Sequence, residues 1–562
     1  MEDKRTLLAF LLIGVILFGM PYYLDLVGMG PPPEGEPPAS SEQTLTQEEP
    51  TAPSSSSATS SESTGSKTNT TATPADPTEP ERSSQSVEAL TAQPFTPRQI
   101  VVQTPFYRFA FSTAGGDLVS AELLKYQLSS GADVQLVPAN MRGLALSFEE
   151  RDQALSLSDF EFVPDKEQVF IESGQNASLS FSANLGNGRR LVKTYTFDGS
   201  RYGFEVSLDA TGFEQDGTLY FHWNKGIPIT EEDPEIDLIE LRAISYMNED
   251  LTEIRATDDV ENYSNKGNVR WTGIRNKYFL SAIVPLRTES LRINLYGEPR
   301  RQGPPDLNYS IGMDVQRNNF TWDNLVYLGP LDYEELVAYE VELERAMDLG
   351  WPIIREISKV LIILFVWAHT HIPNYGVVII LFAVFVKLLL FPFTRKTYES
   401  TAKMQELQPK IAALREKYKN DNQRLSQETM KLYREEGVNP LGGCLPLLPQ
   451  MPIFFALYQV FSSTIELRQA PFILWIDDLS VPDEILIAGI GIHILPLLMA
   501  LSMFFQQKMT MKDPKQAFLV YLMPIMMIFF FWTISSGLVL YWTVFNVLTI
   551  GQQLLTNRNN PT

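Results

Sequence analysis

The most regular feature of the chain is a series of long apolar runs, the first of which lies near residue 1. Thr6–Leu26 is almost purely apolar and follows Lys4 and Arg5. About 20 such residues cross the hydrocarbon core of a bilayer, and flanking basic residues stay on the cytoplasmic side. Gly19–Tyr23 offers no clear small-x-small cleavage site. We therefore predict an uncleaved transmembrane anchor over residues 1–29.

Two segments of different texture follow this run. Residues 30–96 are rich in Pro, Ser, Thr and Glu, and such a segment cannot bury enough apolar surface to fold. Residues 97–345 alternate apolar and polar positions in short segments separated by turns such as Gly115-Gly116-Asp117. We predict a disordered linker followed by a large all-β sandwich, whose strand order the sequence leaves open. Its clearest strands are Phe106–Phe111, Gly143–Phe148, Ala177–Phe181, Leu191–Phe197, Tyr202–Leu208, Thr218–Trp223 and Leu291–Tyr296.

The pattern changes to helical runs after residue 345. Trp351–Thr370 is apolar but carries charged residues near its start, so we predict an amphipathic helix lying at the membrane interface within residues 346–373. Tyr375–Thr394 is continuously apolar except for Lys387. We predict a second span over residues 374–394, ended by Pro392 and the basic residues that follow.

Residues 395–439 form a polar segment with ten Lys and Arg residues. Its apolar positions follow helical spacing, most clearly at Met404, Leu407, Ile411 and Leu414. Asn420-Asp421-Asn422 has the composition of a turn. We predict a helical hairpin, and its positive charge places it in the cytoplasm.

Residues 440–556 contain four further apolar runs. A basic loop within residues 506–515 alternates with an acidic one at residues 463–484. Because basic loops stay on the cytoplasmic side, we predict six spans, with both chain ends in the cytoplasm and the β-domain outside it. Residues 557–562 are then a short cytoplasmic tail. The runs are Leu441–Ser462, Ile485–Phe505, Ala517–Ile534 and Leu538–Leu555.

Charge and composition exclude several classes of function. The net charge is -22, made up of +4 in residues 351–562 and -26 before them, which disfavours nucleic-acid binding. Cys444 is the single cysteine, so there is no disulfide framework and no multi-cysteine metal site. His369 and His371 are more simply explained as interfacial or packing residues than as metal ligands. No nucleotide-binding loop, G-x-S-x-G or H-E-x-x-H motif occurs, and we expect no enzyme activity and no cofactor.

Lys387 is the strongest candidate for a functional residue. It lies seven residues before Thr394, about 10 Å inside the predicted boundary. A charge near the middle of a bilayer costs at least about 2.5–3.5 kcal/mol, and no acidic residue lies in the predicted spans after residue 373 to pair with it. Either the Lys side chain snorkels to the interface, or it lies in a water-containing cavity open to the cytoplasm.

Polar residues and prolines in the neighbouring spans favour the cavity. They comprise a helix-breaking group at Pro446, Pro449, Gln450 and Pro452, and Ser502, Gln506, Gln507, Pro524, Asn546 and Thr549. Such groups are tolerated at membrane depth where protein or water satisfies them. The alternative is ordinary hydrogen bonding between helices, worth about 0.6 kcal/mol each. Met-rich and aromatic stretches could likewise guide apolar segments or simply face lipid.

Several strings in the second half resemble one known family. AKMQELQPKI, SQETMKLYREEGVNPLGGC and PLLPQMPIFFALY precede ELRQAPFILWIDDLS and SGLVLYWTVFN. Together they resemble the YidC/Oxa/Alb family of membrane protein insertases, and particularly its Gram-negative bacterial branch. The resemblance implies an insertase and chaperone of the inner membrane whose five core spans enclose a hydrophilic groove, open to cytoplasm and lipid. It places Lys387 where the family has an Arg, Gln450 and Pro452 at groove positions, and Tyr541 and Trp542 at a tyrosine pair.

The resemblance also implies partners. Nascent membrane proteins would be the clients and the Sec translocon a helper, with the ribosome and the signal recognition particle or its receptor as further candidates. Two rival functions stay open on the residues alone. A secondary transporter would also use a mid-membrane Lys, although it predicts inverted repeats that we do not find. A sugar enzyme on an anchor would need a cluster of His and carboxylates, and His222 stands alone in its strand.

Overall fold

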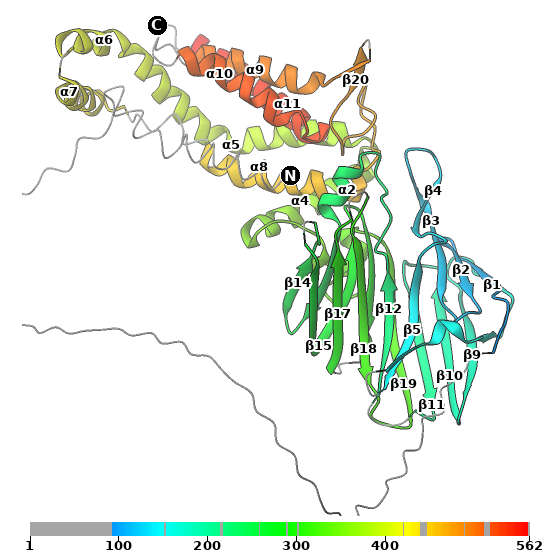
Figure 1. Cartoon of the computed structure of the whole chain (residues 1–562). Coiled ribbons are helices and arrows are strands. Elements are labelled where there is room, and N and C mark those ends of the chain that lie inside the picture. The colour runs from blue at the N-terminus through cyan, green and yellow to red at the C-terminus, as the bar shows by residue number, and fades with distance from the viewer. Residues whose placement is uncertain are drawn as a thin grey trace, which may run out of the picture. The chain divides into compact units, whose positions relative to one another are not determined.

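The computed structural model describes residues 93–562 except 151–152, 214–216, 258, 288–289, 301–302, 420, 439–446, 488, 511–516 and 560–562. The predicted anchor and nearly all of the predicted linker lie outside the described residues. Figure 1 shows a β-rich part and a group of long helices that follows it in the chain.

The β-rich part has 19 strands in one hydrogen-bonded network. They are β1 Gln99–Gln103, β2 Tyr107–Ser112, β3 Leu118–Gln127, β4 Asp133–Val137, β5 Arg142–Glu150, β6 Gln153–Ser156, β7 Val163–Pro164, β8 Gln168–Phe170, β9 Asn176–Gly186, β10 Arg189–Asp198, β11 Phe204–Thr211, β12 Gly217–Asn224, β13 Arg242–Met247, β14 Asp250–Ile254, β15 Glu261–Arg275, β16 Phe279–Pro285, β17 Ser290–Glu298, β18 Asp306–Asp314 and β19 Asn319–Pro330.

The network folds into two layers that share the long strand β15. One layer runs β8–β1–β2–β3–β5–β12–β18–β17–β15. The other runs β7–β9–β10–β11–β19–β16–β15–β13–β14. Residues 261–268 of β15 pair in the first layer and residues 269–275 in the second, so this strand turns the corner between them.

Aromatic side chains fill the space between the layers. Phe111 on β2 contacts Tyr195 on β10, with ring centroids 4.4 Å apart, and Phe109 contacts Phe204 on β11 at 5.2 Å. Because alternate residues of a strand face opposite sides, the Tyr-x-Phe-x-Phe pattern of β2 turns its rings inward. The β-rich domain expected from the alternating pattern is therefore present.

The remaining elements are helices, short 3-10 turns and one small hairpin. They are η1 Leu157–Asp159, α2 Pro234–Glu240, α3 Tyr333–Val337, η2 Leu343–Ala346, α4 Pro352–His371, α5 Tyr375–Glu406, α6 Gln408–Lys417, α7 Asn422–Glu435, α8 Leu447–Ser463, η4 Ile465–Leu467, β20 Ile485–Ile487, β21 Ile490–Ile492, α9 Ile494–Thr510, α10 Ala517–Phe531 and α11 Ser536–Asn559.

Helix α5 extends beyond the predicted second span. Its apolar part ends at Pro392, but the helix continues through this proline to Glu406. A proline inside a helix removes one backbone hydrogen bond and costs about 3 kcal/mol, a loss that packing of the flanking turns can offset. The predicted hairpin therefore begins within α5. Its second helix, α7, starts as expected, with Asp421 accepting a hydrogen bond from the Arg424 amide at 2.9 Å.

The apolar run predicted at Ile485–Phe505 is also corrected. Its first part is the hairpin β20–β21, and helix α9 begins only at Ile494. The isoleucines of this stretch are β-branched and favour strands, while Gly489 adopts a left-handed φ of 80° suited to a tight turn. The helix-breaking group on the preceding run is partly wrong as well, since Pro452 lies inside α8.

Two described helices are long and apolar enough to cross a membrane, Tyr375–Pro392 within α5 and Ser536–Leu555 within α11. Helices α9 and α10 contain shorter apolar stretches, Ile494–Met509 and Val520–Phe531. The count of six spans stays a prediction.

The long helices pack as two connected groups. Helix α4 packs on α8, where Phe365 stacks on Phe461 with centroids 5.7 Å apart. Helices α5 and α9 pack on α11, and α10 packs on α9. The side of α4 away from α8 exposes Ile353, Val360 and Trp367, each by more than 60 %. This apolar face suits the predicted interfacial position of α4, which stays a prediction.

The β-domain contains a carboxylate whose ionisation is coupled to folding. Burial opposes ionisation of Asp314, but hydrogen bonds from Lys266, Arg292 and Thr218 outweigh it and lower the pKa of Asp314 to about 2. In the unfolded chain the pKa of an Asp is about 3.9. A lowered pKa stabilises the fold above the unfolded value, and this stabilisation is lost as the pH falls through the folded value.

We expect the Asp314→Asn variant to be less stable than the parent chain at pH 7. The difference should shrink between about pH 4 and about pH 2, because the parent carboxylate becomes protonated there. Thermal unfolding of the detergent-solubilised chain, followed by tryptophan fluorescence across this pH range, measures it. A difference that stays constant from pH 7 to pH 2 would contradict the coupling.

Candidate functional site

Lys387 is buried at the contact between α5 and α11. It lies in the last third of the apolar part of α5, Tyr375–Pro392, and only 7 % of the residue is exposed. Its ammonium group donates a hydrogen bond to the Thr549 hydroxyl of α11 at 2.7 Å. The side chain therefore points into the helix interface rather than reaching a distant surface.

Helix α11 presents Thr549 as an acceptor. The Thr549 hydroxyl donates its own hydrogen to the Phe545 carbonyl one turn earlier, at 2.7 Å, so its lone pairs are turned toward Lys387. The Lys387 ammonium also lies 4.8 Å from the centre of the Phe545 ring, close enough for a cation–π contact. Among the described residues no carboxylate lies within ion-pair distance of Lys387. The cation is held by neutral groups alone.

A second polar contact continues the line along the same two helices. The Gln552 side-chain amide of α11 donates to the Thr394 hydroxyl of α5 at 3.1 Å. Thr394, Gln552 and the adjacent Gln553 are each less than 9 % exposed. Polar side chains therefore follow the α5–α11 contact from Lys387 toward the C-terminal ends of both helices. We call this row the polar line; it consists of Lys387, Thr394, Thr549, Gln552 and Gln553.

Buried polar atoms on the neighbouring part of α11 have no hydrogen-bond partner in the part of the chain that the structure describes. The Asn546 amide nitrogen and the Tyr541 hydroxyl are buried and accept or donate no hydrogen bond among the described residues. Ser502 of α9 is also buried and donates to its own helix, at the Met499 carbonyl. Buried polar atoms are rarely left unsatisfied, and ordered water is their usual partner where protein is absent.

The predicted residues of α8 lie apart from this cluster. Gln450 and Pro452 are half-buried in the first turns of α8, and the structure records no contact between either of them and Lys387. Helix α8 contacts α11 through Phe454 and Trp542, whose ring centroids are 4.9 Å apart. Gln506 of α9 is half-buried and has a partner within the chain. The structure thus gathers Lys387, Ser502, Tyr541 and Asn546 near α11, with Trp542 facing α8.

Three polar positions were missed by sequence reasoning. Gln552 and Gln553 were not selected, and Thr394 was treated as a boundary residue. A signal was available, because Asn546, Thr549 and Gln552 or Gln553 repeat at intervals of three and four, which places them on one face of a helix. The contact from Thr549 to Lys387 additionally required knowing that α5 and α11 are neighbours.

The predicted hairpin residues form a small separate cluster. Leu407 and Ile411 are buried together with Val438, and Met404 packs against them. Leu414 is half-buried. No group of three or more His, Cys, Asp or Glu that could hold a metal ion occurs in the part of the chain that the structure describes.

Known proteins resemble this chain over nearly its whole described length. The family 60Kd inner membrane protein matches residues 367–562, and the YidC periplasmic domain matches residues 99–364. The membrane protein insertase YidC of Pelobacter propionicus is 36% identical over 494 residues, covering 83% of this chain and 88% of the relative. That of Chlorobaculum parvum is 34% identical over 487 residues, covering 82% of each. A crystal structure of an active YidC insertase is similar with a TM-score of 0.36 and 19% identity, covering 81% of this chain and 92% of that one.

Replacing Thr549 by Val tests the contact that holds Lys387. Val has nearly the same shape but no acceptor, so the buried ammonium loses its hydrogen bond, a loss of about 1.5–3 kcal/mol for a charged group. We expect Thr549→Val to lower the thermal midpoint of the detergent-solubilised chain and Thr549→Ser to preserve it.

Thr543→Val is the matched control. Thr543 lies on the same helix and donates the same kind of backbone bond, to the Val539 carbonyl at 2.7 Å, but the structure records no contact with a lysine. Equal midpoints for the Thr549→Val and Thr543→Val variants would show that the acceptor contributes nothing.

Proposed function

This chain belongs to the YidC family of membrane protein insertases, and we propose that it inserts client segments through the polar line that begins at Lys387. As in its family, it is an inner-membrane insertase with a periplasmic domain and not an enzyme. The observation that carries the proposed mechanism is the buried Lys387 cation, which is held by Thr549 and has no carboxylate partner among the described residues.

An unpaired cation at this depth attracts the acidic part of a client. Keeping a charge within the hydrocarbon region costs about 2.5–3.5 kcal/mol or more, and a carboxylate that approaches it recovers part of this cost. Thr549 and the Phe545 ring satisfy Lys387 only with neutral groups, which a client carboxylate can replace. Lys offers a point charge without the two-pronged geometry of Arg, so attraction by charge is retained while bidentate pairing is not.

The remaining polar groups supply a wet path. Asn546 and Tyr541 have buried polar atoms that water would satisfy, and Thr394 and Gln552 extend the line. A polar client segment that enters such a groove crosses less hydrocarbon, which lowers the barrier to translocation. Gln450, Pro452, Ser502, Gln506 and Trp542 would line the facing walls, from which the apolar client segment leaves into lipid.

The proposed orientation has six spans with both chain ends and the hairpin of residues 395–439 in the cytoplasm. The segment after α8 is assigned to the periplasm. Its Arg468 is hydrogen-bonded to Glu231 and Gln127 of the β-domain, which supports this side. The ten basic residues of the hairpin support the cytoplasmic side.

Nascent membrane proteins are the clients of the family. From the family resemblance we assign the Sec translocon as a helper. The positive charge of the hairpin supports the ribosome and the signal recognition particle or its receptor as its contacts. The transporter that a mid-membrane Lys also allowed is not favoured, because the relatives that match over most of the chain are named insertases.

Reconstitution of the purified chain in liposomes tests the function. A client with one span and an acidic translocated segment becomes protected from external protease when it is inserted. Two unit charges a few Å apart in a partly screened site interact by a few kcal/mol, so we expect Lys387→Glu to reduce protection by at least about tenfold. Lys387→Arg should retain it.

Lys508→Glu provides the control for a charge reversal elsewhere in the core. Lys508 is exposed near the end of α9, outside the polar line. Equal protection by the Lys387→Glu and parent chains would refute the role of the groove charge, and protection equal to empty liposomes for the parent chain would refute autonomous insertion.

A further inference from the structure

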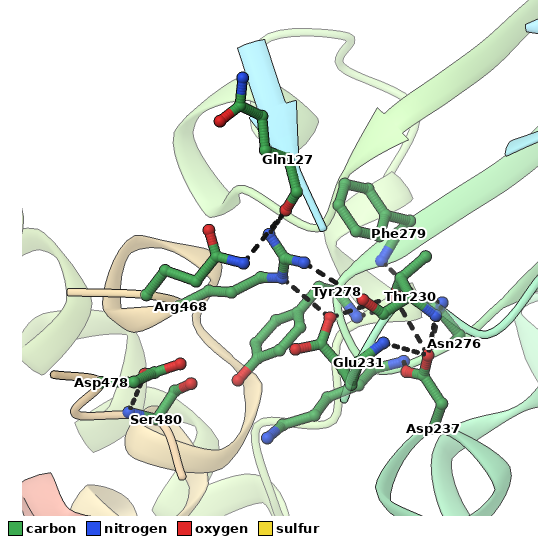
Figure 2. A network of polar contacts seen from close by, with 12 residues as sticks. Gln127, Thr230, Glu231, Asp237, Asn276, Tyr278, Phe279, Arg468, Asp478 and Ser480 are labelled. Carbon is green, nitrogen blue, oxygen red and sulfur yellow. Dashed lines mark hydrogen bonds and ion pairs between the residues drawn. The ribbon is translucent and has the colours of Figure 1, made fainter. Parts of the chain in front are cut away.

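A buried arginine in the segment between α8 and α9 binds to the β-domain. Arg468 follows the short turn η4, and its side chain is only 3% exposed. Figure 2 shows its guanidinium surrounded by residues from well-separated parts of the β-domain, with Gln127, Thr230 and Tyr278 on different segments.

Each of the three nitrogens of the guanidinium donates a hydrogen bond. Its Nε donates to the Glu231 carboxylate at 2.8 Å, and its two terminal nitrogens donate to the carbonyls of Gln127 at 2.8 Å and Thr230 at 3.3 Å. The neighbouring Gln469 also donates to the Gln127 carbonyl, at 3.1 Å. A fixed planar fork with several donors fits such a set of acceptors, whereas the compact ammonium of Lys does not.

Hydrogen bonds within the β-domain hold two of these acceptors in place. Asp237, at the start of α2, is fully buried and accepts from the amides of Thr230 and Glu231 at 2.5 and 3.2 Å. It also accepts from the Asn276 side chain at 3.4 Å. Asp237 thus fixes the backbone that carries both the Glu231 carboxylate and the Thr230 carbonyl (Figure 2).

Two aromatic rings complete the receptor. The Arg468 guanidinium lies 6.0 Å from the centre of the Tyr278 ring and 5.7 Å from that of Phe279. Aromatic faces at this distance attract a guanidinium, and more strongly where water is excluded. Carboxylate, carbonyls and rings together form a built site for one guanidinium group.

Arg468 lies directly beyond the end of a helix of the core. Helix α8 ends at Ser463, and only Thr464 and the turn η4 separate it from Arg468. Helix α8 packs on α4 and meets α11 through the contact of Phe454 with Trp542. The Arg468 site therefore ties the end of α8 to the β-domain, while Leu479 and Val481 further along the same segment accept backbone hydrogen bonds from the start of α11.

We propose that Arg468 is a positioning residue of the insertase, which locks into the guanidinium receptor of the β-domain and thereby holds α8 as a fixed wall of the client groove. This rests on the proposed function and extends it, because it gives the β-domain a mechanical part in insertion. Loss of the arginine frees the end of α8 and leaves the Glu231 carboxylate buried without its partner.

Chemical rescue tests the proposal in the full chain. Arg468→Ala leaves the receptor intact but empty, and ethylguanidinium added at millimolar concentration supplies the missing fork. Ethylammonium, which carries the charge without the fork, is the matched probe. The two readouts are amide hydrogen exchange of residues 464–483 and insertion of the single-span client in liposomes.

We expect Arg468→Ala to accelerate exchange of residues 464–483 by at least about tenfold, since breaking a buried ion pair is strongly destabilising locally. Client insertion should fall in parallel. Ethylguanidinium should reverse both changes, and ethylammonium neither. Arg292→Ala, which removes an exposed arginine of β17 bonded to Asp314, is the control variant and should change neither readout.

Any other result of these two measurements would contradict one step of the proposal. Unchanged exchange would show that Arg468 does not hold the segment, and faster exchange with normal insertion would show that α8 needs no such anchor. Rescue of exchange without rescue of insertion would also refute the coupling. If Arg468→Ala does not fold, Glu231→Gln keeps the shape of the receptor and should shift both readouts in the same direction, and no shift would refute the proposal. The response to Lys387→Glu, measured on the same client, reports the proposed function independently.

Discussion

The structure of the helical core depends on keeping the Lys387 ammonium group away from bulk water with no counterion among the residues that the structure describes. Lys387 is 7 % exposed between α5 and α11, and its recorded partners are a hydroxyl and an aromatic ring. Such an arrangement is stable only if the surroundings remain polar enough to solvate the charge, which explains why buried amides and hydroxyls follow the same helix contact. The cation and the polar side chains along the α5–α11 contact therefore form one feature, because each lowers the free-energy cost of burying the other.

The contact between the β-domain and the core also buries a cation, but this cation has a full set of partners. Arg468 is as deeply buried as Lys387, yet it has a carboxylate, two carbonyls and two rings around it. A satisfied guanidinium fixes geometry, whereas an under-satisfied ammonium stays available to a ligand. The chain uses the first to hold α8 in place and leaves the second open to the client.

The residues that sequence reasoning located are those whose signal is local. Lys387 stood out because a charge interrupts an apolar run, and the strands of the β-domain followed from alternation over a few residues. The prediction of one apolar helical run over Ile485–Phe505 was wrong, because its first part forms the hairpin β20–β21. The continuation of α5 beyond Pro392 was not predicted, because packing of the flanking turns offsets the cost of a proline inside a helix. The receptor for Arg468 was beyond reach, since it combines Gln127, Thr230, Glu231 and Tyr278 with a residue more than 180 positions further on. Its parts carry no shared motif and are brought together only by the fold.

The central claim is that the charge at position 387 selects the client segment that enters the groove. The most direct test compares two clients that differ only in whether the translocated segment carries Asp or Lys, inserted into liposomes without a membrane potential. The account predicts that the parent chain favours the Asp client and that Lys387→Glu reverses this preference. The same preference in both chains would contradict it.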